Sequence, residues 1–180
     1  MDDISLSQII LNAKNAYDAE EFEQAAQWYE RASQQYSAQN DPLTAAEMTN
    51  NRSVSVLRAG NAQSAFSIAK GTEQIFAQAG DIRRQAMALG NQAAALDAMN
   101  KSDDAIKYYQ QCNELLKQVN DPILRTYVLQ SLSGLYLRRR HYLDALVVME
   151  AALDIKEHLS IREKILKKLL QVVSRLLGRS

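Results

Sequence analysis

Histidine and cysteine, the side chains that most often carry nucleophilic or metal chemistry, are few in this chain and far apart. His141 and His158 are the only two histidines, and no Cys, His or carboxylate cluster at metal-ligand spacing accompanies them. The single cysteine, Cys112, is expected to be a buried structural thiol rather than a nucleophile. Small or short side chains hold the equivalent places at 40-residue intervals: Ala32, Thr72 and Ala152. No glycine-rich phosphate loop occurs either. The sequence predicts no enzyme, no metal ion and no cofactor.

Side chains suited to binding, by contrast, recur at a fixed interval. Asn51 and Asn91 are 40 residues apart, and Ser131 continues the row. An asparagine amide both donates and accepts, so it can hold the backbone of an extended peptide whatever its sequence. The alternative is that these asparagines bond to a neighbouring helix. Gly90 and Gly134, inside predicted helices, indicate a close approach of either a helix or a ligand.

The same interval of 40 residues organises the whole chain. Alanine recurs in this register, and so do three boundary signatures: Ala25, Ala65, Ala105 and Ala145, then 40–42 (NDP), 80–82 (GDI) and 120–122 (NDP). A fixed period of this length is typical of a solenoid, in which each unit buries its apolar face against its neighbours. We predict one domain of four repeats, at about 2–40, 41–80, 81–120 and 121–159.

Each repeat divides into two predicted helices. Asp41, Asp81 and Asp121 are expected N-caps, and Pro42 and Pro122 suit the first helical position. First helices are predicted at 5–19, 42–59, 82–99 and 122–139, and second helices at 22–38, 62–79, 102–119 and 142–158. Small residues mark the expected helix crossings (Ala13, Ser53, Ala93, Ser133). In the second repeat an alanine, Ala69, replaces the Tyr or Met of its neighbours, so its packing is expected to differ there.

The stretch from Ser160 to Gly178 is predicted to be a separate amphipathic helix. Its apolar residues fall at helical spacing, and its other face is mostly Lys and Arg. A solenoid needs a terminal helix over its last exposed core face, so capping is the expected role. Two alternatives stay open: lying on an anionic membrane surface, or docking on a partner.

Composition and charge narrow the class of protein further. The 180 residues carry no net charge, are 47% hydrophobic and contain no apolar run long enough to span a membrane. An acidic N-terminus and a lone cysteine favour a soluble cytoplasmic protein. Residues 1–50 hold nine acids and two bases, whereas residues 121–180 hold six acids and eleven bases. This asymmetry suggests either solvated helix faces or association of the acidic head with a basic tail. A pI near 6.7 argues against nucleic acid as the main ligand.

The repeats resemble the tetratricopeptide family. The fourth repeat carries the likeness best, with residues at the family's characteristic places: Leu129, Leu132, Ser133, Tyr136, Ala145 and Met149. The period is 40 rather than 34, which resembles the longer-helix branch seen in kinesin light chains. The resemblance implies an all-α fold, a right-handed α-α superhelix of four helix pairs plus a C-terminal capping helix.

The resemblance also implies a concave groove lined by the first helix of each pair. Its expected peptide-binding residues are Glu47, Asn50, Asn51, Arg58, Met87, Asn91, Asp97, Tyr127, Gln130, Ser131 and Arg138. Kinesin light chains use asparagines at the places of Asn51 and Asn91 to hold peptide backbone; we expect Arg58, Asp97 and Arg138 to select charge. A clamp for a carboxylate tail is not expected, because most of its basic positions are missing.

The function implied is a non-enzymatic protein-interaction scaffold with a protein or peptide partner. Two alternatives are kept: a self-assembling structural solenoid that joins acidic head to basic tail, and a regulatory peptide-sensor domain.

Overall fold

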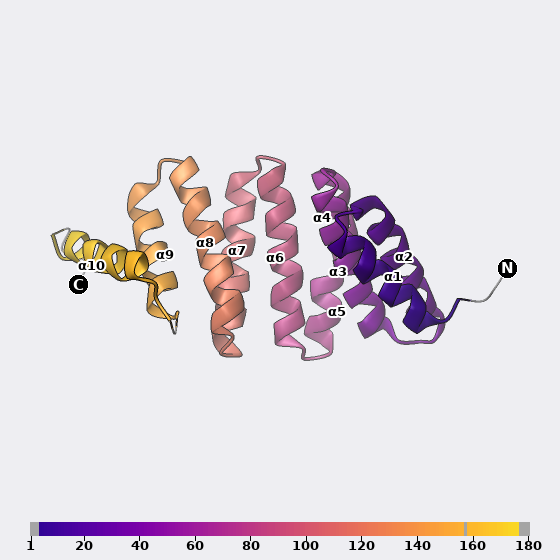
Figure 1. The fold of residues 1–180 in the computed structure, drawn as a ribbon. Coiled ribbons are helices and arrows are strands. Elements are labelled where there is room, and N and C mark those ends of the chain that lie inside the picture. The colour runs from indigo at the N-terminus through magenta and orange to yellow at the C-terminus, as the bar shows by residue number, and fades with distance from the viewer. Residues whose placement is uncertain (1–3, 157, 177–180) are drawn as a thin grey trace. The chain divides into compact units, whose positions relative to one another are not determined.

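The computed structural model describes residues 4–156 and 158–176, and every regular element in these ranges is a helix. The helices are α1 Leu6–Asp18, α2 Phe22–Ala38, α3 Pro42–Arg58, α4 Ala62–Ala69, α5 Thr72–Gln78, α6 Ile82–Ala98, α7 Ser102–Gln118, α8 Pro122–Arg138, α9 Tyr142–Asp154 and α10 Ile161–Leu176 (Figure 1). Most of these bounds lie within a residue of those predicted. Within the described ranges, no helix has the length and apolar content needed to cross a bilayer.

The repeat boundaries are built as the sequence predicts. The carboxylates of Asp41, Asp81 and Asp121 accept the backbone N–H three residues ahead at 2.9–3.0 Å. These hydrogen bonds hold the pKa of Asp41 and of Asp81 below the usual value. The residue before each cap takes a left-handed conformation, with φ of 57° at Asn40, 70° at Gly80 and 50° at Asn120. Asparagine and glycine are the residues that tolerate this conformation best, so the boundary signatures have a direct structural cause.

The prediction of a single helix at 62–79 is wrong, because the chain breaks into α4 and α5 after Ala69. Gly71 has φ 94°, a conformation that favours glycine. The break is closed by side chains: Thr72 donates to the carbonyl of Ala69 at 2.6 Å, and Glu73 accepts the Gly71 N–H at 2.9 Å. Gln92 of α6 donates to the same Glu73 carboxylate at 2.7 Å. The small side chain of Ala69 and the flexible Gly71 thus let both short helices pack on α6.

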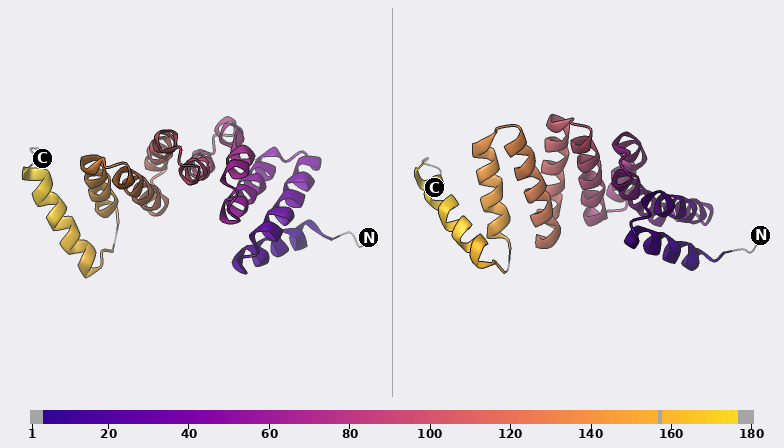
Figure 2. Two further views of the ribbon diagram at one scale, coloured as in Figure 1. Left: turned by 90° about the horizontal axis from the view of Figure 1, so that it is seen from above. Right: turned by 45° about the horizontal axis from the view of Figure 1, so that its top comes forward.

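The chain forms two compact units, Met1–Tyr108 and Tyr109–Ser180, with α7 passing from one to the other. In the first unit α2 packs on α1 and α3, and α6 packs on α4 and α5 (Figure 2). The predicted crossing residues are buried there: Ala13, Ala25, Ser53, Ala65 and Ala93. Larger apolar residues fill the spaces between them, among them Ile9, Tyr29, Met48 and Phe76.

The second unit is built around the pair of α8 and α9. Leu129, Leu132 and Leu135 of α8 are buried, and Ser133 donates to the carbonyl of Ala145 at 3.0 Å across the helix crossing. Cys112 is buried as predicted. The helix α9 ends at Asp154, four residues before the predicted end, and an irregular connection leads to α10.

The start of α10 is fixed by a capping box. Ser160 accepts the N–H of Glu163 at 3.3 Å, and Glu163 accepts the N–H of Ser160 at 2.8 Å. The helix packs on α9, but Leu170 is the one apolar residue of the described part of α10 that is fully buried. We expected its apolar face to cover the last core surface; most of that face is exposed instead.

Candidate functional site

A polar cleft lies between α3 and α6 in the first unit. Its volume is about 470 Å³. We call it the α3–α6 cleft; its lining residues are Glu47, Asn50 and Asn51 of α3, Phe76 of α5, Asp81 before α6, and Arg83, Arg84, Met87 and Asn91 of α6. Five of the predicted groove residues therefore lie together: Glu47, Asn50, Asn51, Met87 and Asn91.

Arg84 organises the charge of this cleft. Its Nε bonds to Asp81 Oδ2 at 2.6 Å, and its Nη1 bonds to Glu47 Oε2 at 2.9 Å. Its guanidinium also lies 5.5 Å from the centre of the Phe76 ring. The hydrogen bond to Asp81 is the main cause that raises the pKa of Arg84 above its usual value. Because two carboxylates surround this arginine and Arg83 adds a second positive charge, the lining is polar but close to charge-balanced.

The asparagines of the cleft differ in what they bond to. Asn50 is buried and donates to Thr72 Oγ1 at 3.0 Å, so its amide helps to hold the break between α4 and α5. Asn91 donates to Asn50 Oδ1 at 3.4 Å, a long bond between α6 and α3. The side-chain amide of Asn51, half-buried, makes no hydrogen bond to a described residue. The alternative of bonding between helices thus describes Asn50 and in part Asn91, but not Asn51.

Two other predicted residues of the first unit lie at the far ends of their helices. Arg58, in the last turn of α3, places its guanidinium 4.7 Å from the centre of the Phe22 ring. Asp97 is half-buried in the last turn of α6. Neither residue lines the α3–α6 cleft. Their role in charge selection stays a prediction.

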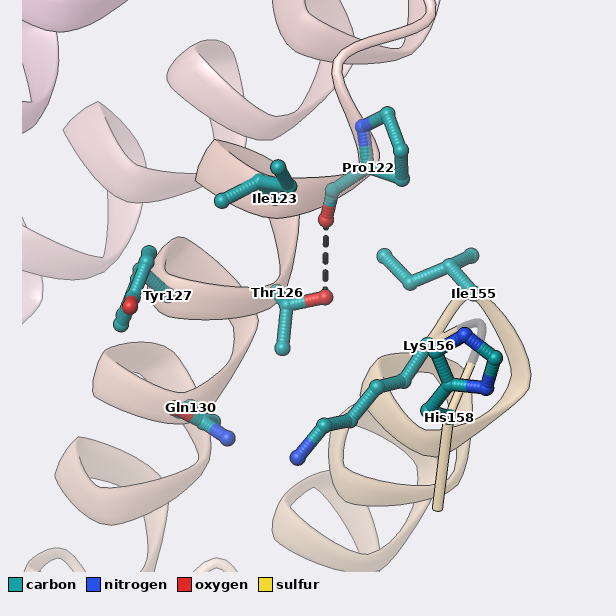
Figure 3. Close-up of a pocket in the computed structure, with 8 residues that line it drawn as sticks. All are labelled: Pro122, Ile123, Thr126, Tyr127, Gln130, Ile155, Lys156 and His158. Atoms are coloured by element: carbon teal, nitrogen blue, oxygen red, sulfur yellow. Dashed lines mark hydrogen bonds between the residues drawn. The ribbon is translucent and has the colours of Figure 1, made fainter.

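A second cleft, more apolar, lies between α8 and the connection from α9 to α10 (Figure 3). Its volume is about 350 Å³. We call it the α8 cleft; its lining residues are Pro122, Ile123, Thr126, Tyr127 and Gln130 of α8, and Ile155, Lys156 and His158 of the connection. Tyr127, a predicted groove residue, is 64% exposed beside Ile123, which is 69% exposed. Exposed large apolar side chains at a cleft mark an interaction surface.

Three predicted features of α8 lie on the same exposed side of the helix. Gln130 lines the α8 cleft, and Ser131 is exposed with its hydroxyl bonded back to the carbonyl of Tyr127 at 3.1 Å. Arg138 is exposed in the last turn. At Gly134, an added Cβ would meet only the Arg138 Nη1, at 3.7 Å. Of the two causes considered for this glycine, a close helix contact therefore does not apply.

Sequence reasoning missed several lining residues. Arg83 and Ile123 are equivalent, 40 residues apart, and lie one turn before the predicted Met87 and Tyr127. That helical spacing was the signal that could have found them. Ile155, Lys156 and His158 fell inside a helix predicted to end at 158, so no sequence signal indicated a cleft there.

Catalytic or metal chemistry finds no support among the residues that the structure covers. No group of three or more His, Cys, Asp or Glu side chains that could hold a metal ion occurs among them. What the two clefts offer is hydrogen-bonding amides and exposed apolar surface.

The family model of the soluble NSF attachment protein, SNAP, matches residues 7–170. The chain therefore belongs to this family of helical-repeat proteins. No curated protein sequence matches it.

Solved structures show the same fold at low sequence identity. A crystal structure of BtubC (BKLC) from P. vanneervenii matches with a TM-score of 0.74 at 20% identity, covering 97% of this chain and 73% of that one. A putative kinesin light chain from Podosopora anserina with nearly identical TPR-like repeats matches with a TM-score of 0.70 at 13% identity, covering 97% and 92%. A variant of that same protein gives 0.71 at 12% identity, with 97% of both chains covered. The protein is thus a tetratricopeptide-type repeat protein with an all-α solenoid fold.

Proposed function

We propose that this protein is a non-enzymatic scaffold that binds an extended segment of a partner protein in the α3–α6 cleft. Repeat proteins of this fold are generally interaction scaffolds and generally non-catalytic. The proposal adds a place and a mode of binding. The amide of Asn51, together with that of Asn91, exchanges hydrogen bonds with the backbone of the bound segment.

The observation that carries the proposal is the unused hydrogen-bonding capacity of Asn51. Its amide lies half-buried in the cleft with no bond to a described residue, although Asn50 beside it is fully engaged. Burying such a group against a ligand without a partner costs about 1–3 kcal/mol, so a ligand that pairs with it is favoured over one that does not. A peptide backbone offers both the donor and the acceptor that an amide needs.

The balanced charge of the cleft supports the same mode. Glu47 and Asp81 already pair with Arg84. A ligand carrying one strong charge would compete with these ion pairs, whereas a peptide backbone would not. In the second unit the exposed Tyr127 and Ile123 offer apolar contact for side chains rather than for backbone.

The experiment compares the wild-type protein with the Asn51→Ala/Asn91→Ala variant. Partners are captured from native lysate, identified by mass spectrometry, and the binding segment is then titrated against each variant. The double variant should bind at least about tenfold more weakly, because two backbone contacts are lost, and its helical content should not change.

A matched control changes two asparagines outside the cleft, Asn12→Ala/Asn15→Ala in α1, and should leave affinity unchanged. If the cleft variant binds as tightly as the wild type, the peptide site is wrongly placed. If both variants lose affinity equally, the loss has a cause other than the cleft.

A further inference from the structure

The helix α10 presents a narrow apolar stripe to solvent. We define the α10 stripe as Ile161, Ile165, Leu169, Val172 and Leu176, which are between 54% and 81% exposed. At 100° per residue these five side chains fall within less than a quarter of the helix circumference. A continuous exposed stripe of this kind is typical of an interaction surface.

The rotation of α10 against α9 leaves this stripe uncovered. Leu170 is buried, and two ion pairs hold the same side of the helix: Lys167 Nζ to Asp154 Oδ1 at 2.8 Å, and Glu163 Oε1 to Lys156 Nζ at 2.6 Å. Residues 163, 167 and 170 lie on the opposite part of the helix from the centre of the stripe. The stripe is therefore presented by specific contacts rather than by loose packing.

The spacing within the stripe is that of a coiled-coil seam. Ile165, Leu169, Val172 and Leu176 follow one another at intervals of four, three and four residues. They correspond to positions d, a, d and a of a heptad. In this register Lys168 and Arg175 take the g positions, whose charges pair across a helix interface. Neither makes an ion pair with a described residue.

We propose that the α10 stripe binds an amphipathic helix of a partner protein, with acidic side chains beside its apolar seam to pair with Lys168 and Arg175. The interface is of the helix-to-helix kind, distinct from the peptide backbone site in the α3–α6 cleft. This proposal does not rest on that site.

A second copy of α10 fits this surface poorly. In an antiparallel pair the g positions face each other, which would bring Lys168 of one copy near Arg175 of the other. In a parallel pair the g positions face e positions, and these are Leu166 and Val173. A membrane surface is also disfavoured, because α10 has no aromatic side chain to anchor it at a lipid interface.

The test uses the full chain and two designed helical peptides of about three heptads, with the same Leu/Ile seam. The acidic probe carries Glu at its e and g positions, and the basic probe carries Lys. Fluorescence anisotropy should give the acidic probe at least about tenfold higher affinity. The variant Lys168→Glu/Arg175→Glu should reverse that preference, and Leu169→Asp should weaken both probes by a similar factor.

A control with the same change of net charge, Lys14→Glu/Lys101→Glu in the first unit, should bind as the wild type does. Equal affinity for the two probes, or a preference that charge reversal does not invert, would overturn the proposal. So would tighter binding to phosphatidylserine vesicles than to the acidic probe. A dimer seen by analytical ultracentrifugation and abolished by Leu169→Asp would assign the stripe to a second copy instead.

Discussion

At the scale of single residues, the asparagines of the α3–α6 cleft show how neighbouring polar groups divide between structure and binding. Asn50 donates from its amide to Thr72, and so stabilises the break between α4 and α5. Asn51, the next residue along α3, has an amide to which no described side chain bonds. A helix turns by about 100° per residue, so adjacent amides meet different surroundings. The repeat row of asparagines therefore contains more than one role.

Gly134 gives a test at the same scale. Gly134→Ala should stabilise the protein by about 1 kcal/mol, because alanine is the better helix former and its Cβ meets only a contact at 3.7 Å. Thermal unfolding should then occur about 2–4 °C higher. If close approach of a ligand explains the glycine, the same variant should bind the partner more weakly.

The matched control is Gly71→Ala, where the φ of 94° makes any side chain strained. Its melting temperature should fall rather than rise. A fall at Gly134 as well would mean that the helix there is packed more closely than the structure shows.

At the scale of elements, the first turn of α10 depends on a single carboxylate. Glu163 accepts hydrogen bonds from Lys156 and from the N–H and hydroxyl of Ser160. The bond from Lys156 is the main cause, followed by the Ser160 backbone, that lowers the pKa of Glu163 to about 2. The ionised form thus holds both the start of the helix and its contact with the end of α9.

This carboxylate predicts a response to acid. A group with a lowered pKa stabilises the fold above its ordinary value of 4.5, and that contribution disappears as the pH falls toward about 2. The amide protons of α10 should therefore exchange faster with solvent as the pH falls through this window, compared with those of α8 after correction for intrinsic rates. Glu163→Gln should exchange fast already at about pH 6 and show a smaller step. Protection in α10 that stays constant down to about pH 2 would contradict the role of Glu163.

At the scale of the whole molecule, the uneven distribution of charge makes self-association testable. The first 50 residues carry a formal charge of −7, and the last 60 carry +5. If the acidic head of one copy binds the basic tail of another, association should weaken with salt. Above about 0.3 M the screening length falls below roughly 6 Å. Sedimentation velocity at low and high ionic strength measures this, and a mass that does not depend on salt would exclude head-to-tail assembly.

The helices and their boundaries were predictable because their causes are local. The carboxylates of Asp41, Asp81 and Asp121 cap donors three residues away, and Asn40 or Gly80 ends the preceding helix by its own backbone conformation. The period of 40 residues then repeats these local choices along the chain. The candidate site was predictable to the extent that helical spacing decides which side chains share a face, and this places Asn51 and Met87 on the same cleft.

The amino-acid sequence by itself determined the class of fold, the positions of the caps and the faces of the helices. Tertiary structure decided the division of α4 from α5, the pairing of Asn50 with Thr72, and the rotation that turns the α10 stripe toward solvent. The physical reason is distance along the chain. A cap bonds to a residue three positions away, whereas the bond of Glu73 to Gln92 joins residues that only helix packing brings together.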